Sequence, residues 1–323
     1  MLKYIFKRIL MMIPVLLGVL FLVFTMNEIS PGDPAAMIAG DAASVEVVEQ
    51  IREDLGLNKP LPVRFFNYTK NLVLHGDLGT SYKTKRPVLD EVMDRLPTTI
   101  LLSLTSAAFA VFLSIPIGII SAIKQNTWID NLLMVLALIG VAMPAFWQGL
   151  MTIILLSVKL GWFPSYGFTT PAHWFMPVLT IGTGAMASLV RITRSSMLEV
   201  IRQDYIRTAR AKGQTERKVI ISHALRNSMI PIITAIAIQL GSMLGGAIVT
   251  ETVFAIPGIG MLMIQSIKAR DYPTIQGAVV VIAVMFSLLN LVVDIIYTFV
   301  DPRLKSIYQT KRKAKHFIAK SET

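Results

Sequence analysis

Six long apolar stretches constrain the fold of this chain more than any other feature. They cover approximately residues 9–26, 99–122, 132–157, 177–194, 231–255 and 277–300. A membrane-spanning helix needs about 20 mostly apolar residues, so each stretch is long enough, or nearly so, to cross a bilayer. Charged residues make up only 16% of the chain, against about 25% in soluble domains. The sequence therefore predicts an all-α integral membrane protein with six transmembrane helices. It excludes an ordinary soluble enzyme, a disordered chain and a basic nucleic-acid-binding domain.

The distribution of Lys and Arg predicts the orientation of the spans, because basic residues gather at cytoplasmic helix ends. If the N-terminus is cytoplasmic, so are residues 1–8, 123–131, 191–230 and 301–323. Together these segments hold 20 Lys and Arg against 6 Asp and Glu, whereas the opposite segments hold 11 basic and 12 acidic residues. We therefore expect both termini in the cytoplasm. No small-residue cleavage site follows the first stretch, so we expect it to remain as a span.

The spans divide the chain into four parts. We expect a cytoplasmic N-terminus and first span at 1–26, an extracytoplasmic helical subdomain at 27–98, a transmembrane core at 99–300 with a cytoplasmic loop at 197–230, and a basic cytoplasmic tail at 301–323. The Lys- and Arg-rich run in the tail suits contact with anionic membrane lipid.

The outer segment 27–98 contains two amphipathic patterns. One helical face gathers Val45, Val47, Val48, Ile51 and Leu55, and a second apolar pattern leads up to Pro97. Two compatible interpretations follow. The segment is a small helical cap packed on the spans, or it is a docking surface for an extracytoplasmic partner.

The cytoplasmic loop reads as two helices joined at a glycine. Residues 197–212 form a basic amphipathic pattern that stops at Gly213, and a shorter helix over 215–227 leads to Pro231, which is expected to open the fifth span. A basic surface helix can serve as a lipid anchor. However, Ala209, Ala211 and Gly213 keep this turn slim, which suits a docking element better than an anchor.

These residues carry a family resemblance. The run Arg207-Thr208-Ala209-Arg210-Ala211-Lys212-Gly213, followed by His223-Ala224-Leu225-Arg226-Asn227, resembles the cytoplasmic coupling loop of ABC-importer permeases. It is most similar to the peptide and nickel branch, and in particular to the first membrane subunit of dipeptide and oligopeptide importers. Arg207, Thr208 and Arg226 stand where the broad family pattern has Glu, Ala and Pro, a variant that is common in the peptide branch.

Other strings of the same branch follow one another in order along nearly the whole chain. They are Pro31-Gly32-Asp33-Pro34, Gly76-Asp77-Leu78-Gly79-Thr80-Ser81-Tyr82, Glu251-Thr252-Val253-Phe254, Pro257-Gly258-Ile259-Gly260, Arg270-Asp271-Tyr272-Pro273 and Asn290-Leu291-Val292-Val293-Asp294.

The resemblance implies a type I ABC-importer permease that neither binds nor hydrolyses ATP. It implies a homologous second permease as heterodimer partner, two cytoplasmic ATPase subunits that bind ATP-Mg, and an extracytoplasmic substrate-binding protein. It places the ATPase-coupling helix at residues 207–213. Gly213 would allow the turn, and Ala209 and Ala211 would allow close approach of an ATPase subunit. The positive charges of Arg207, Arg210 and Lys212 would face acidic residues of that subunit. No phosphate-binding P-loop pattern occurs in the chain. No catalytic residue, cofactor or metal site is expected, and no nucleic-acid partner.

Polar and small residues inside the spans are candidates for the translocation path or for helix packing. They are Gln148, Gln239, Gly241, Ser242, Gly245, Asn290 and Asp294. Gly241 and Gly245 form a GxxxG pattern that serves close packing equally well, and Asn290 and Asp294 suit a structural pair. Pro116 and Pro144 are expected to kink the second and third spans.

The leading hypothesis is a permease subunit that imports short peptides across a bacterial or archaeal cytoplasmic membrane. Within the same branch, nickel chelates or glutathione are alternative solutes. None of the four histidines pairs with another at metal-ligand spacing. A stand-alone secondary transporter would need an ion-coupling carboxylate near the bilayer centre, and an intramembrane enzyme would need a catalytic motif such as HExxH or GxSxG. The sequence places neither.

Overall fold

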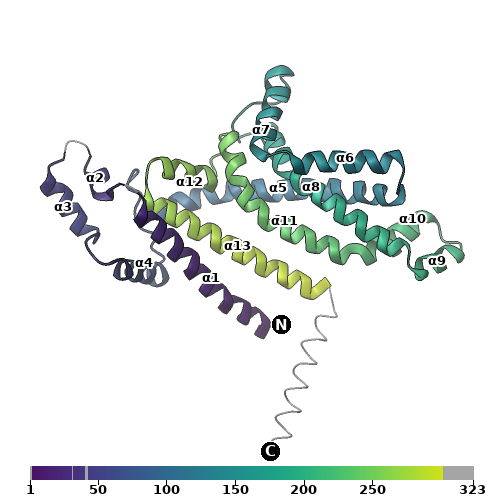
Figure 1. Cartoon of the computed structure of the whole chain (residues 1–323), viewed down its shortest axis with the longest axis horizontal. Coiled ribbons are helices and arrows are strands. Elements are labelled where there is room, and N and C mark those ends of the chain that lie inside the picture. The colour runs from purple at the N-terminus through teal and green to yellow at the C-terminus, as the bar shows by residue number, and fades with distance from the viewer. Residues whose placement is uncertain (1, 31, 41–42, 301–323) are drawn as a thin grey trace, which may run out of the picture.

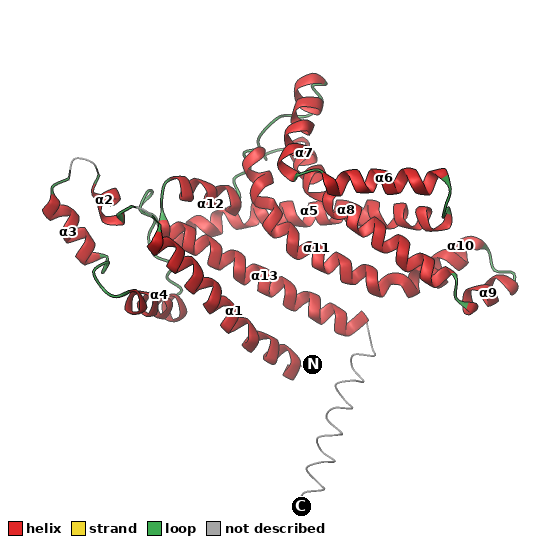
Figure 2. Ribbon diagram, viewed as in Figure 1, coloured by secondary structure: helices red, strands yellow, loops and turns green. Residues whose placement is uncertain are grey.

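The computed structural model describes residues 2–30, 32–40 and 43–300, without the side chains of residues 2–4, 244, 246, 294 and 296–300. The described part is almost entirely helical, with an isolated bridge between Thr80 and Pro87 (Figure 2). In chain order the elements are α1 (Leu2–Ile29), α2 (Pro34–Ala39), α3 (Val45–Asp54), α4 (Leu61–His75), α5 (Val88–Ile123), α6 (Trp128–Ala142), α7 (Ala145–Thr152), the π-helix η1 (Ile153–Lys159), α8 (Pro171–Ile201), α9 (Asp204–Ala211), α10 (Glu216–Lys218), the π-helix η2 (Val219–Leu225), α11 (Arg226–Val253), α12 (Ile259–Lys268) and α13 (Tyr272–Val300).

The spans agree with the six apolar stretches. Within the described residues, five helical segments are long and apolar enough to cross a membrane, and a bent pair of helices supplies a sixth if it is counted as one span. The long helices α1, α5, α8, α11 and α13 run side by side in one layered bundle (Figure 1). The expected all-helical membrane architecture is therefore confirmed.

The third span is broken rather than kinked. Helix α6 ends at Ala142, α7 begins at Ala145, and the pair is bent by 105°. Met143 lies in the extended region, at ψ 125°, because the ring of Pro144 disfavours a helical conformation in the residue before it. The expectation of a simple kink at Pro144 is therefore too weak.

Two other prolines do not lie at helix boundaries, contrary to expectation. Pro97 lies inside α5, so the outer amphipathic pattern and the second span form one helix of 36 residues. Pro231 lies inside α11, which continues without interruption from α10 and η2. The expected separate helix over 215–227 and a fifth span opening at Pro231 are both wrong. A proline removes one backbone hydrogen bond, and packing neighbours commonly stabilise such helices in membranes.

The core depends on close approach between α5 and α8. A Cβ added at Gly118 would lie 2.5 Å from Cβ of Thr193, and one added at Gly182 would lie 2.5 Å from the ring of Phe109. Small residues let helix backbones approach in this way. Around them, buried side chains of α5, α8 and α11 form an apolar cluster of Ala107, Ala110, Ala185, Leu189, Ala235 and Met243.

The two ends of the bundle carry different elements (Figure 1). Helices α2, α3 and α4 extend from one end, and α9 and α10 lie at the other. Helix α4 is tied to α1 by an ion pair of Arg64 with Glu28 at 2.6 Å. Helix α3 has no buried residue, so in the outer segment it is α4, and not α3, that packs on the spans.

Candidate functional site

The segment expected to couple the chain to ATPases forms a short separate helix at the end of the bundle. The expected single helix over 197–212 is divided, because α8 ends at Ile201 and α9 begins at Asp204 after an extended Gln203. Gly213 follows α9 with φ +76°, a left-handed conformation that favours glycine. The turn assigned to Gly213 is therefore present, and the chain also turns at Gln203.

Helix α9 is anchored by its own apolar side chains. Ile206 and Ala209 are buried in one cluster with residues from the ends of α5 and α8 and from η2, namely Ala122, Met197, Val219, Ile220 and Ala224. Ala209 therefore packs inside the chain, and the expectation that it permits close approach of a partner is wrong. Burying Ile206 and Ala209 fixes α9 to three other elements, so a displacement of α9 is transmitted to them.

The outward surface of α9 combines small, cationic and aromatic side chains. Arg207, Thr208, Ala211 and Lys212 are exposed, and so is Tyr205, with 45% of its surface accessible. Tyr205 lies two residues before the family-like run that begins at Arg207, so the motif does not mark it as part of this surface. Two cations have intrachain partners: Arg210 pairs with Glu216 at 2.7 Å and Arg207 with Asp204 at 3.7 Å.

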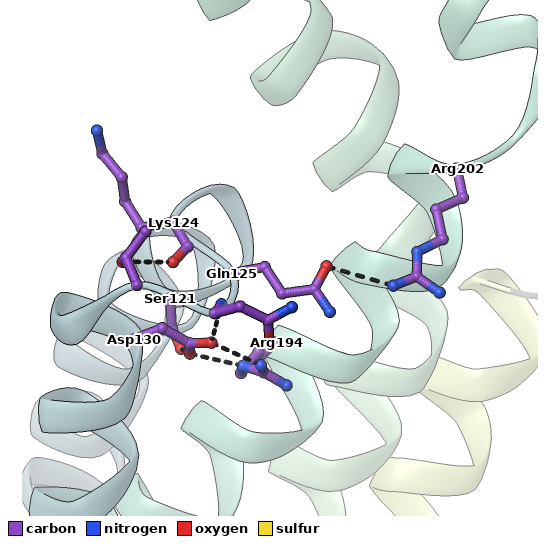
Figure 3. Close-up of polar contacts among 8 residues, drawn as sticks. Ser121, Lys124, Gln125, Asp130, Arg194 and Arg202 are labelled. Atoms are coloured by element: carbon purple, nitrogen blue, oxygen red, sulfur yellow. Dashed lines mark hydrogen bonds and ion pairs between the residues drawn. The ribbon is translucent and has the colours of Figure 1, made fainter.

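A buried ion pair braces the same end of the bundle (Figure 3). The carboxylate of Asp130, at the start of α6, accepts hydrogen bonds from Nε and Nη2 of Arg194 on α8 at 2.8 and 2.7 Å. It also accepts bonds from the Ser121 hydroxyl and from the Asn126 backbone N–H. Every oxygen of this buried carboxylate is thus satisfied, and the turn between α5 and α6 is fixed to α8.

A second contact lies closer to α9. Arg202, which follows α8, donates a hydrogen bond to Oε1 of Gln125 at 3.3 Å (Figure 3). Arg194 and Arg202 therefore connect the α5–α6 turn to the part of the chain that leads into α9. Neither contact is predicted from the sequence, because the paired residues lie 64 and 77 positions apart. The available signal was Asp130, the one acid in a short predicted loop.

Three of the path candidates converge on one cavity. Gln148, Gln239 and Ser242 line a space of about 300 Å³ beside the break between α6 and α7, bounded also by α8 and α11. Nε2 of Gln148 donates to the Thr183 hydroxyl, and the Ser242 hydroxyl donates to the Gln239 side chain at 3.0 Å. The hydroxyl of Thr250, buried in the same wall, has no protein partner within the described residues.

The other path candidates lie elsewhere. Gly241 faces Phe286 of α13, whose ring would lie 3.0 Å from an added Cβ, whereas Gly245 faces open space. The GxxxG pattern therefore packs within the chain at one of its two glycines. Asn290 is exposed on α13 and donates to the Phe286 carbonyl of its own helix. The Asp294 side chain and the basic tail lie outside the described residues.

At the opposite end, a buried carboxylate holds α12 in place. Glu251, fully buried at the end of α11, accepts from the Thr99 hydroxyl at 2.6 Å and from the Met261 N–H at 3.1 Å. The Thr99 hydroxyl accepts in turn from the Ile259 N–H at 2.9 Å. These residues cap the N-terminus of α12, where Gly258 has no side chain to do so.

The family-like strings meet at this end as well. Asp271 accepts from the Ser81 hydroxyl at 2.5 Å and from the Tyr82 N–H at 2.9 Å, and an added Cβ at Gly32 would lie 2.8 Å from Nη1 of Arg270. Strings separated by up to 238 residues thus form one junction. Burial raises the pKa of the Tyr82 phenol to about 12.

Metal ligands do not gather in the described part of the chain, where no group of three His, Asp or Glu side chains is placed to hold an ion. His173 contacts the Thr170 hydroxyl at 2.7 Å and His223 contacts Gln214 at 2.7 Å. Both histidines therefore have local structural partners. His316 lies outside the described residues.

Two family models match the chain in succession. The model described as a binding-protein-dependent transport system inner membrane component matches residues 114–306. A second, described as the N-terminal part of such membrane components, matches residues 1–105.

Individual relatives match almost end to end. The chain is 45% identical to the glutathione transport system permease protein GsiC of Pectobacterium atrosepticum, over 94% of this chain and 99% of that protein. It is 42% identical to the dipeptide transport system permease protein DppB of Alkalihalophilus pseudofirmus, over 94% of this chain and the whole of that protein.

Solved structures share the fold. A chain of the inward-facing MetNI methionine ABC transporter superposes with a TM-score of 0.56 at 20% identity, covering 66% of this chain and 97% of that one. A chain of an amino acid ABC transporter with histidines gives a TM-score of 0.51 at 14% identity, over 65% and 94% of the two chains.

Proposed function

The chain belongs to the binding-protein-dependent transport system inner membrane components and is a permease subunit of an ABC importer, and from this premise we propose that its solutes are short peptides, from dipeptides to glutathione. The observation that carries this proposal is the end-to-end match to glutathione and dipeptide permeases. Glutathione is itself peptide-like, so one polar path would serve both. The nickel-chelate alternative has no comparable support.

The proposed assembly contains four kinds of subunit. This chain forms half of the path in a bacterial cytoplasmic membrane, and a homologous permease forms the other half. Two ATPase subunits bind ATP-Mg on the cytoplasmic side, and a binding protein delivers the solute from outside. The chain itself contributes no nucleotide site.

We assign coupling to the exposed surface of α9, formed by Tyr205, Arg207, Thr208, Ala211 and Lys212. This surface fits a groove on an ATPase subunit, with the Gly213 turn at its end. Closure of the ATPases on ATP would displace α9. Because Ile206 and Ala209 are packed against α5, α8 and η2, that displacement would move the spans as a rigid body, which makes α9 the two-state coupling element.

We assign part of the path to the cavity lined by Gln148, Gln239 and Ser242. Peptides carry amide donors and acceptors, and glutamine offers both. The break at Pro144 lies beside this wall, and Met143 and Ala145 on its two sides also line the cavity. Gly241 and Asn290 have packing roles in this account, and Gly245 is left free for contact with the second permease.

Co-purification tests the assembly. The full-length tagged chain is extracted from its native membrane, and the proteins that remain bound are identified. We expect two ATPase subunits and one homologous permease. A chain that purifies alone and transports peptides without ATP would contradict the proposal.

A pair of variants tests the coupling surface. Ala211→Glu adds bulk and charge to the exposed surface of α9 and should remove the ATPases while the chain stays folded. Val45→Glu makes the same kind of change at an exposed position on α3, at the other end of the molecule, and should leave the ATPases bound. Ala209→Glu is a poor test, because a buried charge would unfold the anchor. Retention of the ATPases by a folded Ala211→Glu chain would refute the assignment.

A further inference from the structure

Helix α4 has one face committed to the spans. The ring of Phe65 lies 5.3 Å from that of Phe21 and 5.6 Å from that of Phe24 on α1, and Tyr68 lies 6.0 Å from Phe24. With the Arg64–Glu28 ion pair, the two edge-to-face contacts of Phe65 and the tilted Tyr68–Phe24 contact fix the rotation of α4 about its axis. They therefore also fix which side chains point away from α1.

The side of α4 that points away from α1 is also apolar. Val63, Phe66, Val73 and Leu74 are exposed by 45%, 66%, 72% and 63%. Their spacing places them on one helical stripe, with Lys70 among them. A stripe of large apolar side chains with one long cation is the pattern of a helix lying in a membrane interface.

The depth of α4 indicates what covers this stripe. Phe21 precedes Ile29, the end of α1, by eight residues, or about 12 Å along the helix axis. That depth falls within a hydrocarbon layer about 30 Å thick. The stripe also continues the exposed apolar surface of α1, for example at Leu22, which is 61% exposed.

A groove runs between α4 and two spans at the same level. Its volume is about 270 Å³, and its walls come from α1, α4 and α13. Thr69 contributes a hydroxyl, but the lining is otherwise aliphatic and includes Leu16, Leu20, Leu72, Val73, Val280 and Val284. A narrow aliphatic groove between spans suits a hydrocarbon chain rather than a polar solute.

The remaining edge of α4 is polar. Arg64, Asn67 and Asn71 line a separate cavity of about 770 Å³, together with Glu28 and Asp77. Helix α4 thus has water-compatible side chains on one edge and an apolar stripe on another, which is the arrangement expected at a boundary between water and lipid.

We propose that α4 is an interfacial helix embedded in the leaflet on the predicted outer side, with its stripe against phospholipid acyl chains and one acyl chain in the groove beside α1 and α13. Lys70 extends from the stripe to the headgroup phosphates, as long cationic side chains do at interfaces. The proposal concerns lipid contact alone and is independent of the transported solute.

Site-directed spin labelling tests the proposal directly, because the natural chain contains no cysteine. Phe66→Cys and Val73→Cys are labelled in the full-length chain, purified with the subunits that remain bound and reconstituted in nanodiscs of phosphatidylethanolamine and phosphatidylglycerol. Leu22→Cys on α1 is the lipid-facing reference, and Asn71→Cys on the polar edge is the matched control. Collisions with oxygen report acyl chains, and collisions with a water-soluble nickel chelate report water.

The proposal expects labels at 66 and 73 to match the label at 22, with a ratio of oxygen to nickel-chelate collisions several-fold higher than at 71. Strong nickel-chelate access at 66 and 73 would overturn it by placing the stripe in water. Low access to both reagents would overturn it by showing that a protein surface covers the stripe. Leu74→Cys replaces either stripe variant if that variant fails to insert.

Discussion

At the scale of single residues, the two most buried carboxylates stabilise the structure. The role of Glu251 is hard to predict from the sequence, because a glutamate near the end of an apolar stretch is expected to be exposed to water. In the structure it is fully buried, and with Thr99 it satisfies the free N–H groups at the start of α12. The partners come from α5 and α12, so no local pattern contains the information.

We predict that Glu251→Ala lowers stability strongly. The substitution leaves the Met261 N–H and the Thr99 hydroxyl without acceptors, at about 1–3 kcal/mol for each buried group. Glu251→Gln keeps one carbonyl acceptor and should fall between the parent and Ala. Thermal unfolding of the purified chain measures the order. Glu199→Ala, at an exposed position on α8, should leave the unfolding temperature unchanged. An unfolding temperature for Glu251→Ala equal to the parent's would show that α12 does not need this cap.

The Asp130–Arg194 pair makes a second prediction at this scale. Removing Arg194 leaves a buried, charged carboxylate, which costs about 3 kcal/mol, whereas removing both side chains removes the charge as well. We therefore expect Asp130→Ala combined with Arg194→Ala to cost less than the sum of the single variants. A double-mutant cycle in thermal unfolding measures this difference. Additive effects would mean that the contact seen in Figure 3 contributes no coupling energy.

At the scale of helices, two glycines that look alike in the sequence are required for different structural reasons. Gly213 is required by its backbone angle, with nothing within 4 Å of an added Cβ, whereas Gly118 is required by the proximity of Thr193. We predict that Gly213→Ala costs about 1 kcal/mol, from local backbone strain alone. Gly118→Ala should separate α5 from α8 and reduce the yield of folded chain. Comparing yield and unfolding temperature distinguishes the two cases, and equal losses would contradict this account.

Prolines show how far helix boundaries could be predicted. Pro144 breaks its span by 105°, but Pro97 and Pro231 lie inside continuous helices. All three follow apolar or helix-compatible residues, so sequence alone treats them alike. The number of spans follows from hydropathy, and a turn at Gly213 is predicted from its sequence motif. The division of α8 from α9 and the burial of Ala209 depend on tertiary packing, which those patterns do not encode.

At the scale of the whole molecule, the family-like strings belong to two ends with different tasks. The strings around Gly32, Ser81, Glu251 and Asp271 hold the α12 end together, and the string at 207–213 forms a surface at the opposite end. The order of these strings along the chain is sufficient to suggest a family. The structure adds that most of these strings contact one another, so their co-occurrence reflects one shared junction.

The cavity beside the α6–α7 break lies between these two ends in the bundle, and the last prediction concerns it. Gln148→Leu and Gln239→Leu remove hydrogen-bonding groups from its wall while keeping side-chain size nearly constant. We expect peptide uptake by proteoliposomes of the assembled importer to fall about fivefold for each, since losing one hydrogen bond to a passing solute costs about 1 kcal/mol. ATP hydrolysis should continue, because α9 and its anchor are untouched.

Thr252→Val is the matched control and should leave uptake unchanged. Thr252 lies on the same helix α11 as Gln239, but its hydroxyl donates to the Ile248 carbonyl of that helix. Loss of uptake and hydrolysis together would instead place these glutamines in the coupling of helices, because a path contact changes the passage of solute without stopping the ATPases.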